Sequence, residues 1–146
     1  MVCFFIGHRD APQSVLPQLE SAIQRHIVDY GVTEFVVGQY GAFDRLAVQA
    51  VRKIKEEFPT VKLTILLPFH PSERGAKTPE GCDGTLYPPG LENVPKRFSI
   101  VRANQYMIRH CNYLIAYAWQ AGSNSLRLTE QAKRRRDLVV TELHEN

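Results

Sequence analysis

Cysteine is scarce in this sequence: only three of the 146 residues are cysteines, and they lie far apart. An odd, widely spaced set builds no disulfide framework, and no C-x-x-C or H-x-x-x-H spacing is present to hold a structural zinc ion. The chain also lacks an apolar run of the roughly 18–20 residues that a membrane helix needs. Its opening apolar run is too short for a signal peptide and lacks a basic lead-in. We therefore expect a reduced, cytoplasmic protein with no metal, no cofactor and no membrane association.

The composition is typical of one globular domain. Hydrophobic residues make up 44% of the chain and charged residues 23%, which excludes a disordered or fibrous protein. A chain of this length can bury a core without a disulfide or a metal ion. The net charge of +3 is mild and does not by itself imply nucleic acid. We predict a single domain over residues 1–146.

Short apolar runs alternate with helical patterns along the chain. The predicted strands are residues 2–6, 34–37, 61–67, 112–117 and 138–141. Between them, apolar residues recur every three or four positions, as on one face of a helix, over residues 12–30 and 46–58, and further helices are predicted over residues 98–111 and 126–136. This alternation predicts an α/β domain with a parallel sheet. Residues 69–95 are rich in proline and glycine and show neither period, which predicts a long loop.

Four loops follow predicted strands, and ligands of parallel sheets bind at the carboxyl ends of the strands. These loops are residues 7–10, 38–44, 68–70 and 119–125. Small residues let a backbone approach a ligand, and a helix that follows directs free N–H groups and the positive end of its dipole toward it. The loops therefore predict an anion site, with phosphate the commonest anion. Neither the G-x-G-x-x-G nor the P-loop spacing is present.

Several polar residues near these loops have two interpretations each. Arg9 could bind a phosphate or carboxylate through two nitrogens, or form a salt bridge with Asp10 or Asp44. Asp44 could accept hydrogen bonds from a ribose, or cap the first turn of a helix. Arg102 could reach the crevice, or lie on a solvated helix face.

Five separated segments resemble, in order, the YpsA-like branch of the SLOG superfamily, which joins the DprA/Smf DNA-processing proteins with the Lonely Guy phosphoribohydrolases. Residues 5–9 are similar to the family's TGHR opening, and residues 37–47 to its SGGAxGxDxxA segment. Residues 101–107 resemble the RNxxM helix, residues 112–117 the SDxLIAxY strand, and residues 121–125 stand where the family has GGT.

The resemblance implies a Rossmann-like three-layer sandwich with a five-stranded parallel sheet of order 3-2-1-4-5. It also implies a nucleotide or nucleotide-derived ligand between the first and fourth strands. By position, the ligand-binding residues would be Gly7, His8, Arg9, Gly38, Gly41, Asp44, Arg102, Gly122 and Ser123. The sequence departs from the family where Gln39 and Tyr40 replace small residues. The catalytic glutamate of the Lonely Guy enzymes is missing from its place, since Glu130 lies about two helical turns beyond Gly122.

These observations lead to three hypotheses about function. The first is binding or sensing of a nucleotide-like small molecule. The second is hydrolysis of the N-glycosidic bond of a nucleotide, with Asp44, His8 or Glu130 as the acid or base, so whether the chain is an enzyme stays open. The third is binding of single-stranded DNA, suggested by the basic run 133–136 and by Trp119. Given the mild charge, we do not expect nucleic acid as a partner; a homodimer is left open.

Overall fold

The computed structural model describes residues 1–70, 72 and 79–145. Over these residues, the five predicted strands and the four predicted helices occur in the expected order. The strands are β1 (Val2–Gly7), β2 (Glu34–Val37), β3 (Lys62–Leu66), β4 (Gly84–Leu86), β5 (Tyr113–Tyr117) and β6 (Val139–Glu142). The α-helices are α1 (Leu16–Val28), α2 (Ala42–Ile54), α4 (Ser99–His110) and α5 (Asn124–Lys133). None of the described helices is long and apolar enough to cross a membrane.

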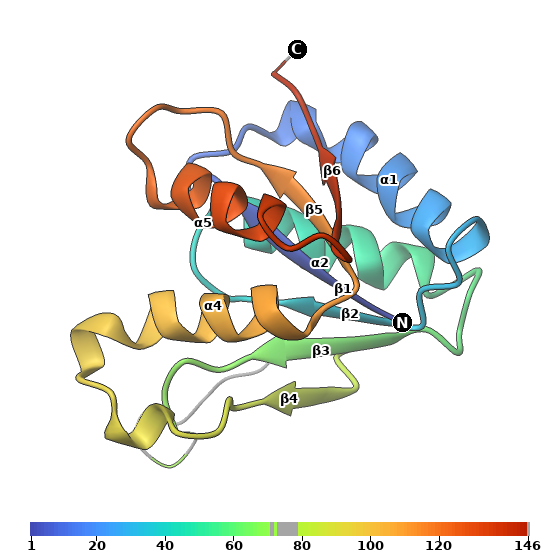
Figure 1. Cartoon of the computed structure of the whole chain (residues 1–146). Coiled ribbons are helices and arrows are strands. Elements are labelled where there is room, and N and C mark those ends of the chain that lie inside the picture. Colours follow the sequence, from blue (N-terminus) through green and yellow to red (C-terminus); the bar gives the residue numbers. More distant parts are fainter. Residues whose placement is uncertain (71, 73–78, 146) are drawn as a thin grey trace.

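The strands form a single parallel sheet with helices on both of its faces (Figure 1). The order is β4-β3-β2-β1-β5-β6, and each neighbouring pair is parallel. Helices α1 and α2 cover one face, and α4 and α5 cover the other. The predicted Rossmann-like sandwich is therefore confirmed, and the five predicted strands have the expected order. The sheet has six strands rather than five, because β4 extends it beside β3.

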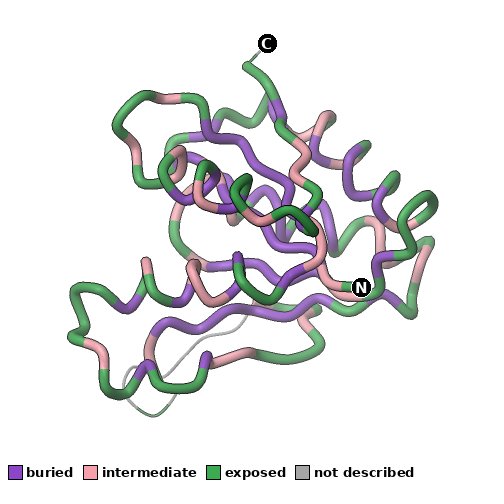
Figure 2. Tube along the Cα trace, in the orientation of Figure 1, coloured by how far each residue is buried: buried purple, intermediate pink, exposed green. Residues whose placement is uncertain are grey.

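Successive residues of the central strand contribute to opposite sides of the core. Phe5 packs with Phe35 and Phe43 beneath α1 and α2, whereas Phe4 packs with Leu114 and with α4 and α5. Figure 2 shows the consequence, since the central strands are buried along most of their length. A strand buried on both faces is continuously apolar rather than alternating, which is the pattern that the sequence shows in this segment.

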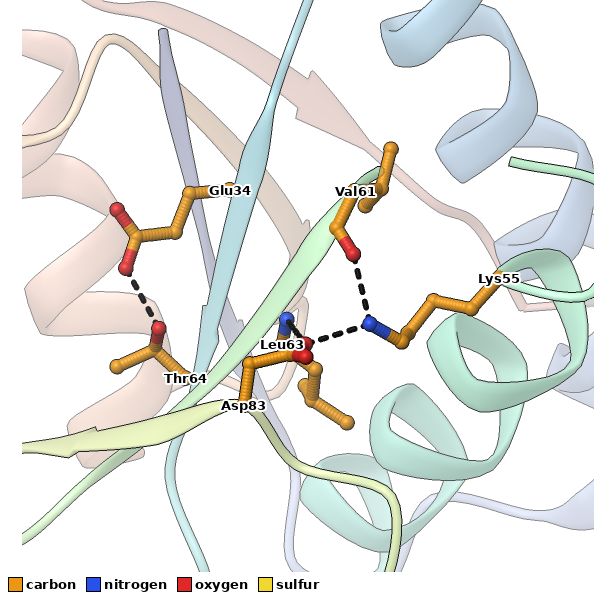
Figure 3. Close-up of polar contacts among 6 residues, drawn as sticks. All are labelled: Glu34, Lys55, Val61, Leu63, Thr64 and Asp83. Atoms are coloured by element: carbon orange, nitrogen blue, oxygen red, sulfur yellow. Dashed lines mark hydrogen bonds and ion pairs between the residues drawn. The ribbon is translucent and has the colours of Figure 1, made fainter. Parts of the chain in front are cut away.

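The additional strand, β4, lies inside residues 69–95, which the sequence predicts as a loop. One carboxylate fixes it: Asp83 Oδ2 accepts hydrogen bonds from the backbone N–H of Leu63 at 2.8 Å and from the Lys55 ammonium (Figure 3). The backbone N–H of Asp83 donates to the carbonyl of Leu63 at 2.7 Å. The hydrogen bond from Lys55 holds the pKa of Asp83 below its usual range. A three-residue strand has no readable period, so the sequence pattern misses it.

Helix α2 lies very close to the end of β1. A Cβ atom built on Gly7 would lie 2.2 Å from the ring of Phe43, a side chain that is fully buried in the core. The absence of a side chain at Gly7 therefore lets the first turn of α2 press against β1. This role is one of packing, and it places the loop after β2 beside the loop after β1.

We expect Gly7→Ala to lower the free energy of unfolding by about 1–3 kcal/mol, because the new methyl group overpacks a filled site. Gly84→Ala is the matched control, since a Cβ there would meet nothing within 4 Å. Urea denaturation of both variants measures the difference. If Gly7→Ala were as stable as Gly84→Ala, the close contact with Phe43 would not constrain the fold.

Candidate functional site

A cavity of about 480 Å³ opens at the carboxyl ends of β1, β2 and β3. Its walls include the first turns of α4 and α5. The sheet order reverses between β1 and β5, and such a switch point is where open α/β sheets bind ligands. The volume lies within the range of roughly 300–1,000 Å³ that is usual for small-molecule sites.

Six of the nine residues predicted for the ligand site line this cavity, namely Gly7, His8, Arg9, Gly38, Asp44 and Ser123. Three do not. Arg102 is exposed on α4, where Val101 and Asn104 line the cavity instead. Gly122 is exposed in a left-handed conformation, with φ +78°, in the turn before α5. Gly41 is packed against backbone. Whether the six residues bind a ligand stays a prediction.

Gly41 brings two loops together. Its φ of +115° suits glycine, and a Cβ atom there would lie 2.6 Å from the Cα of Arg9. The close approach lets the N–H of Ala42 donate to the carbonyl of Arg9 at 2.8 Å, and that of Phe43 to the carbonyl of His8 at 3.4 Å. Two amides at the start of α2 are thus used within the protein. The expectation that this helix offers those amides to a ligand is wrong.

The start of α5 is arranged differently, because among the described residues a side chain accepts a hydrogen bond from only one of the N–H groups in its first turn. The hydroxyl of Ser123 accepts a hydrogen bond from the N–H of Leu126 at 3.1 Å, which is an N-cap, and donates to the carbonyl of Gln120 at 2.8 Å. The hydroxyl of Ser125 donates to the carbonyl of Gly7 at 3.1 Å and so joins α5 to β1. Ser123, Asn124 and Ser125 all line the cavity. The positive end of the α5 dipole therefore lies at its wall.

His8 holds the loop between β5 and α5. Its Nε2 atom accepts hydrogen bonds from the N–H groups of Trp119 at 2.9 Å and Gln120 at 3.2 Å. An acceptor nitrogen carries no proton, so the ring is neutral with its proton on Nδ1. Burial lowers the pKa of His8, an effect that the carboxylate of Asp10 opposes. Because two amides occupy Nε2, the hypothesis that this nitrogen acts as an acid or base is not supported by the geometry.

Arg9 and Asp44 are the charged residues of the predicted set that line the cavity. Arg9 is exposed, and its guanidinium forms no ion pair with Asp10, Asp44 or any other described residue, so the salt-bridge interpretation fails within that part of the chain. Asp44 is half-buried in the first turn of α2, and its Oδ2 accepts a hydrogen bond from the N–H of Tyr40 at 3.0 Å. Burial raises the pKa of Asp44 to about 7, although that hydrogen bond and Arg45 lower it.

The other acidic and basic candidates lie away from the cavity. Glu130 is exposed on α5 and is not part of the cavity wall. In the basic run 133–136, Arg135 donates to the carbonyls of Ile108 and Cys111 and pairs with Asp137. These bonds cap the end of α4. The run lies at the end of α5 opposite to Trp119, so the basic run and the tryptophan ring are not adjacent. No three metal-ligating side chains gather in the described ranges.

Several polar residues of the wall are absent from the nine predicted ligand-binding residues: Tyr40, Asn104, Gln120, Asn124 and Ser125. All except Asn104 lie in the loops 38–44 and 119–125, where the sequence predicts the site. For Asn104 a signal exists, because it lies four residues after Ile100 and four before Ile108 on one helical face. Arg102 falls on the opposite face. The helical period therefore distinguishes these two polar residues of α4, whereas residue type alone favours the arginine.

Taken together, the fold and the cavity define a Rossmann-like α/β domain with a ligand-sized site at its switch point. No protein-family model and no curated protein matches the chain. Among solved structures, DNA processing protein A from Helicobacter pylori is similar, with a TM-score of 0.53 and 16% sequence identity. The match covers 100% of this chain and 67% of that one. At this identity the similarity establishes the fold alone.

The comparison corrects one expectation. DNA processing protein A is described as having a unique single-stranded DNA binding mode. The mild charge of the present sequence led us not to expect nucleic acid as a partner, and that exclusion is wrong, because a protein of this fold binds a nucleic acid strand. Net charge is a property of the whole surface, whereas a strand contacts only one part of it.

We expect the domain to lose stability as the pH falls below about 6.5, because buried His8 resists protonation while the unfolded chain accepts a proton readily. His8→Gln retains an acceptor that does not titrate and should reduce this acid sensitivity. His8→Leu leaves two amides without a partner and should cost about 1–3 kcal/mol near neutral pH.

Urea denaturation at two pH values, followed by the fluorescence of Trp119, measures both effects, since this is the only tryptophan of the sequence. Burial also lowers the pKa of His26. This histidine is unchanged in all variants, so it contributes the same acid sensitivity to each of them. Equal acid sensitivity of wild type and His8→Gln would show that the acceptor role of His8 does not govern its protonation.

Proposed function

We propose that the protein binds a nucleotide or a nucleotide-derived small molecule in the cavity at the strand ends. The observation that carries this proposal is Arg9, which lines the same cavity as the start of α5 and whose guanidinium has no ion-pair partner among the described residues. A cation and a helix N-terminus together favour an anion. The resemblance to the YpsA-like branch of the SLOG superfamily supports the same choice of ligand, and we infer that residues 1–146 act as one domain.

The remaining wall suits the uncharged part of such a ligand. Ile6, Leu66 and Leu128 supply apolar surface, whereas Asn104 and Gln120 supply hydrogen-bonding groups. A site for a heterocyclic ligand needs apolar surface together with hydrogen-bonding groups, and this wall supplies the two in similar measure. The phosphate would lie beside Arg9 and the start of α5, and the nucleoside would extend over the apolar surface.

We expect Arg9→Ala to weaken the binding of AMP by on the order of tenfold or more, because a charged hydrogen bond is worth about 1.5–3 kcal/mol. Arg102→Ala is the matched control, since it removes the same charge from an exposed residue outside the cavity wall. Isothermal titration calorimetry at low salt measures both affinities. If both variants bind AMP as the wild type does, the phosphate does not lie at Arg9.

A second candidate function is the binding of single-stranded DNA. Exposed aromatic rings support it: Tyr40 lines the cavity and Trp119 lies next to Gln120 of its wall, and each is 46% exposed. Bases of a single strand stack on such rings. The similarity to a protein that binds single-stranded DNA supports the same candidate.

We expect an oligothymidylate of about ten nucleotides to bind more tightly than thymidine monophosphate if the strand is the ligand, with an affinity that falls steeply as salt is added. Trp119→Ala should then weaken the binding of the oligothymidylate more than the binding of thymidine monophosphate. Arg136→Ala serves as the control, because it lies in the basic run at the far end of α5 and is exposed. Fluorescence anisotropy of a labelled strand provides the measurement, and absence of binding at low salt would exclude this candidate.

A further inference from the structure

Asp44 occupies a defined place between the end of β2 and the cavity. It is the third residue of α2, and its Oδ2 is held by the N–H of Tyr40 at 3.0 Å. A Cβ atom built on Gly38 would lie 2.8 Å from this oxygen, so the missing side chain of Gly38 provides the room for the carboxyl group. The carboxyl group is therefore fixed in one orientation at the cavity wall.

The second oxygen of Asp44 has no partner in the part of the chain that the structure describes. None of the hydrogen bonds or ion pairs of the described residues involves Oδ1. Fully buried side-chain oxygens all have partners within those residues, so Oδ1 keeps some solvent access, and Asp44 lines the cavity. A half-buried carboxyl group without a cation is costly to desolvate, and burial raises its pKa to about 7. The cost of desolvating such a group is offset when a ligand donates a hydrogen bond to it.

The cavity wall holds groups of both signs, and a nucleotide has to lie so that its phosphate avoids the carboxyl group of Asp44. Arg9 and the start of α5 attract the phosphate, whereas the carboxyl group of Asp44 repels it. A neutral donor is needed beside Asp44. In a nucleotide, the hydroxyl groups of the ribose are neutral donors attached through a short linkage to the phosphate, and carboxylates at the ends of parallel strands bind ribose hydroxyls in other α/β folds.

We propose that Asp44 Oδ1 accepts a hydrogen bond from a ribose hydroxyl and thereby selects ribonucleotides over deoxyribonucleotides. This inference rests on the proposed function, because it assumes a nucleotide with its phosphate at Arg9. It makes Asp44 a specificity-determining residue and Arg9 the residue that supplies affinity for any nucleoside phosphate.

The experiment compares AMP, 2′-deoxy-AMP and 3′-deoxy-AMP by calorimetry on the wild-type chain. We expect at least one deoxy analogue to bind about tenfold more weakly or worse, because a site built around a hydroxyl group rejects a ligand that lacks it. Equal affinity for all three nucleotides would overturn the inference while leaving the proposed function intact. No binding of any nucleotide, including the other three ribonucleoside monophosphates, would overturn both.

Asp44→Asn provides the matching variant, since it keeps an oxygen for the N–H of Tyr40 and removes the charge. Its preference for AMP over the weaker deoxy analogue should fall to near one, with the affinity for that analogue little changed. Asp29→Asn, an exposed residue at the end of α1, makes the same change of charge elsewhere and should keep the preference. A wild-type preference that persists in Asp44→Asn would assign the selection to another residue, and the wild-type comparison stands even if this variant fails to fold.

Discussion

The hydrogen bonds made by the residues at the end of β1 are the constraint on which the site depends. The carbonyls of His8 and Arg9 accept the first amides of α2, and the carbonyl of Gly7 accepts the hydroxyl of Ser125 at the start of α5. The side chain of His8 holds the loop between β5 and α5, because its Nε2 atom accepts hydrogen bonds from the amides of Trp119 and Gln120. Three consecutive residues thus join both neighbouring loops to the central strand. Because the two bonds from Trp119 and Gln120 end on a neutral imidazole, the geometry of this part of the cavity depends on His8 remaining unprotonated.

This arrangement gives the two helices that meet at β1 different roles. At α2, the first amides are used within the protein, and the helix presents the carboxyl group of Asp44. At α5, Ser123 caps the helix, and the first residues of the helix line the same cavity as Arg9. One wall of the cavity therefore favours an anion and the other a neutral hydrogen-bond donor. A nucleotide has both kinds of group at a fixed separation, which is why we infer this class of ligand.

Much of the fold could be predicted from the sequence, because buried parallel strands are continuously apolar and their helices have a clear period. The strand order came from resemblance, and the structure agrees with it. Strand β4 could not be predicted, since it is held by Asp83 across 20 residues of sequence and has no pattern of its own. The role of His8 was missed for the same reason, because its partners lie 111 and 112 residues away. Local spacing placed polar residues near the site, but it could not distinguish a group that faces a ligand from one that holds a loop.

The most direct test of the account is to map the binding of AMP by NMR on the isotopically labelled protein. We predict that the largest changes in amide chemical shift fall on residues 7–10, 38–44 and 120–126, which surround the cavity at the strand ends. The protein has a second groove of about 410 Å³ at the other end of the sheet, lined by Glu34, Lys62 and Tyr106, which serves as an internal comparison. Changes confined to that groove, or no saturable change at all, would contradict the claim that the end of β1 organises a nucleotide site.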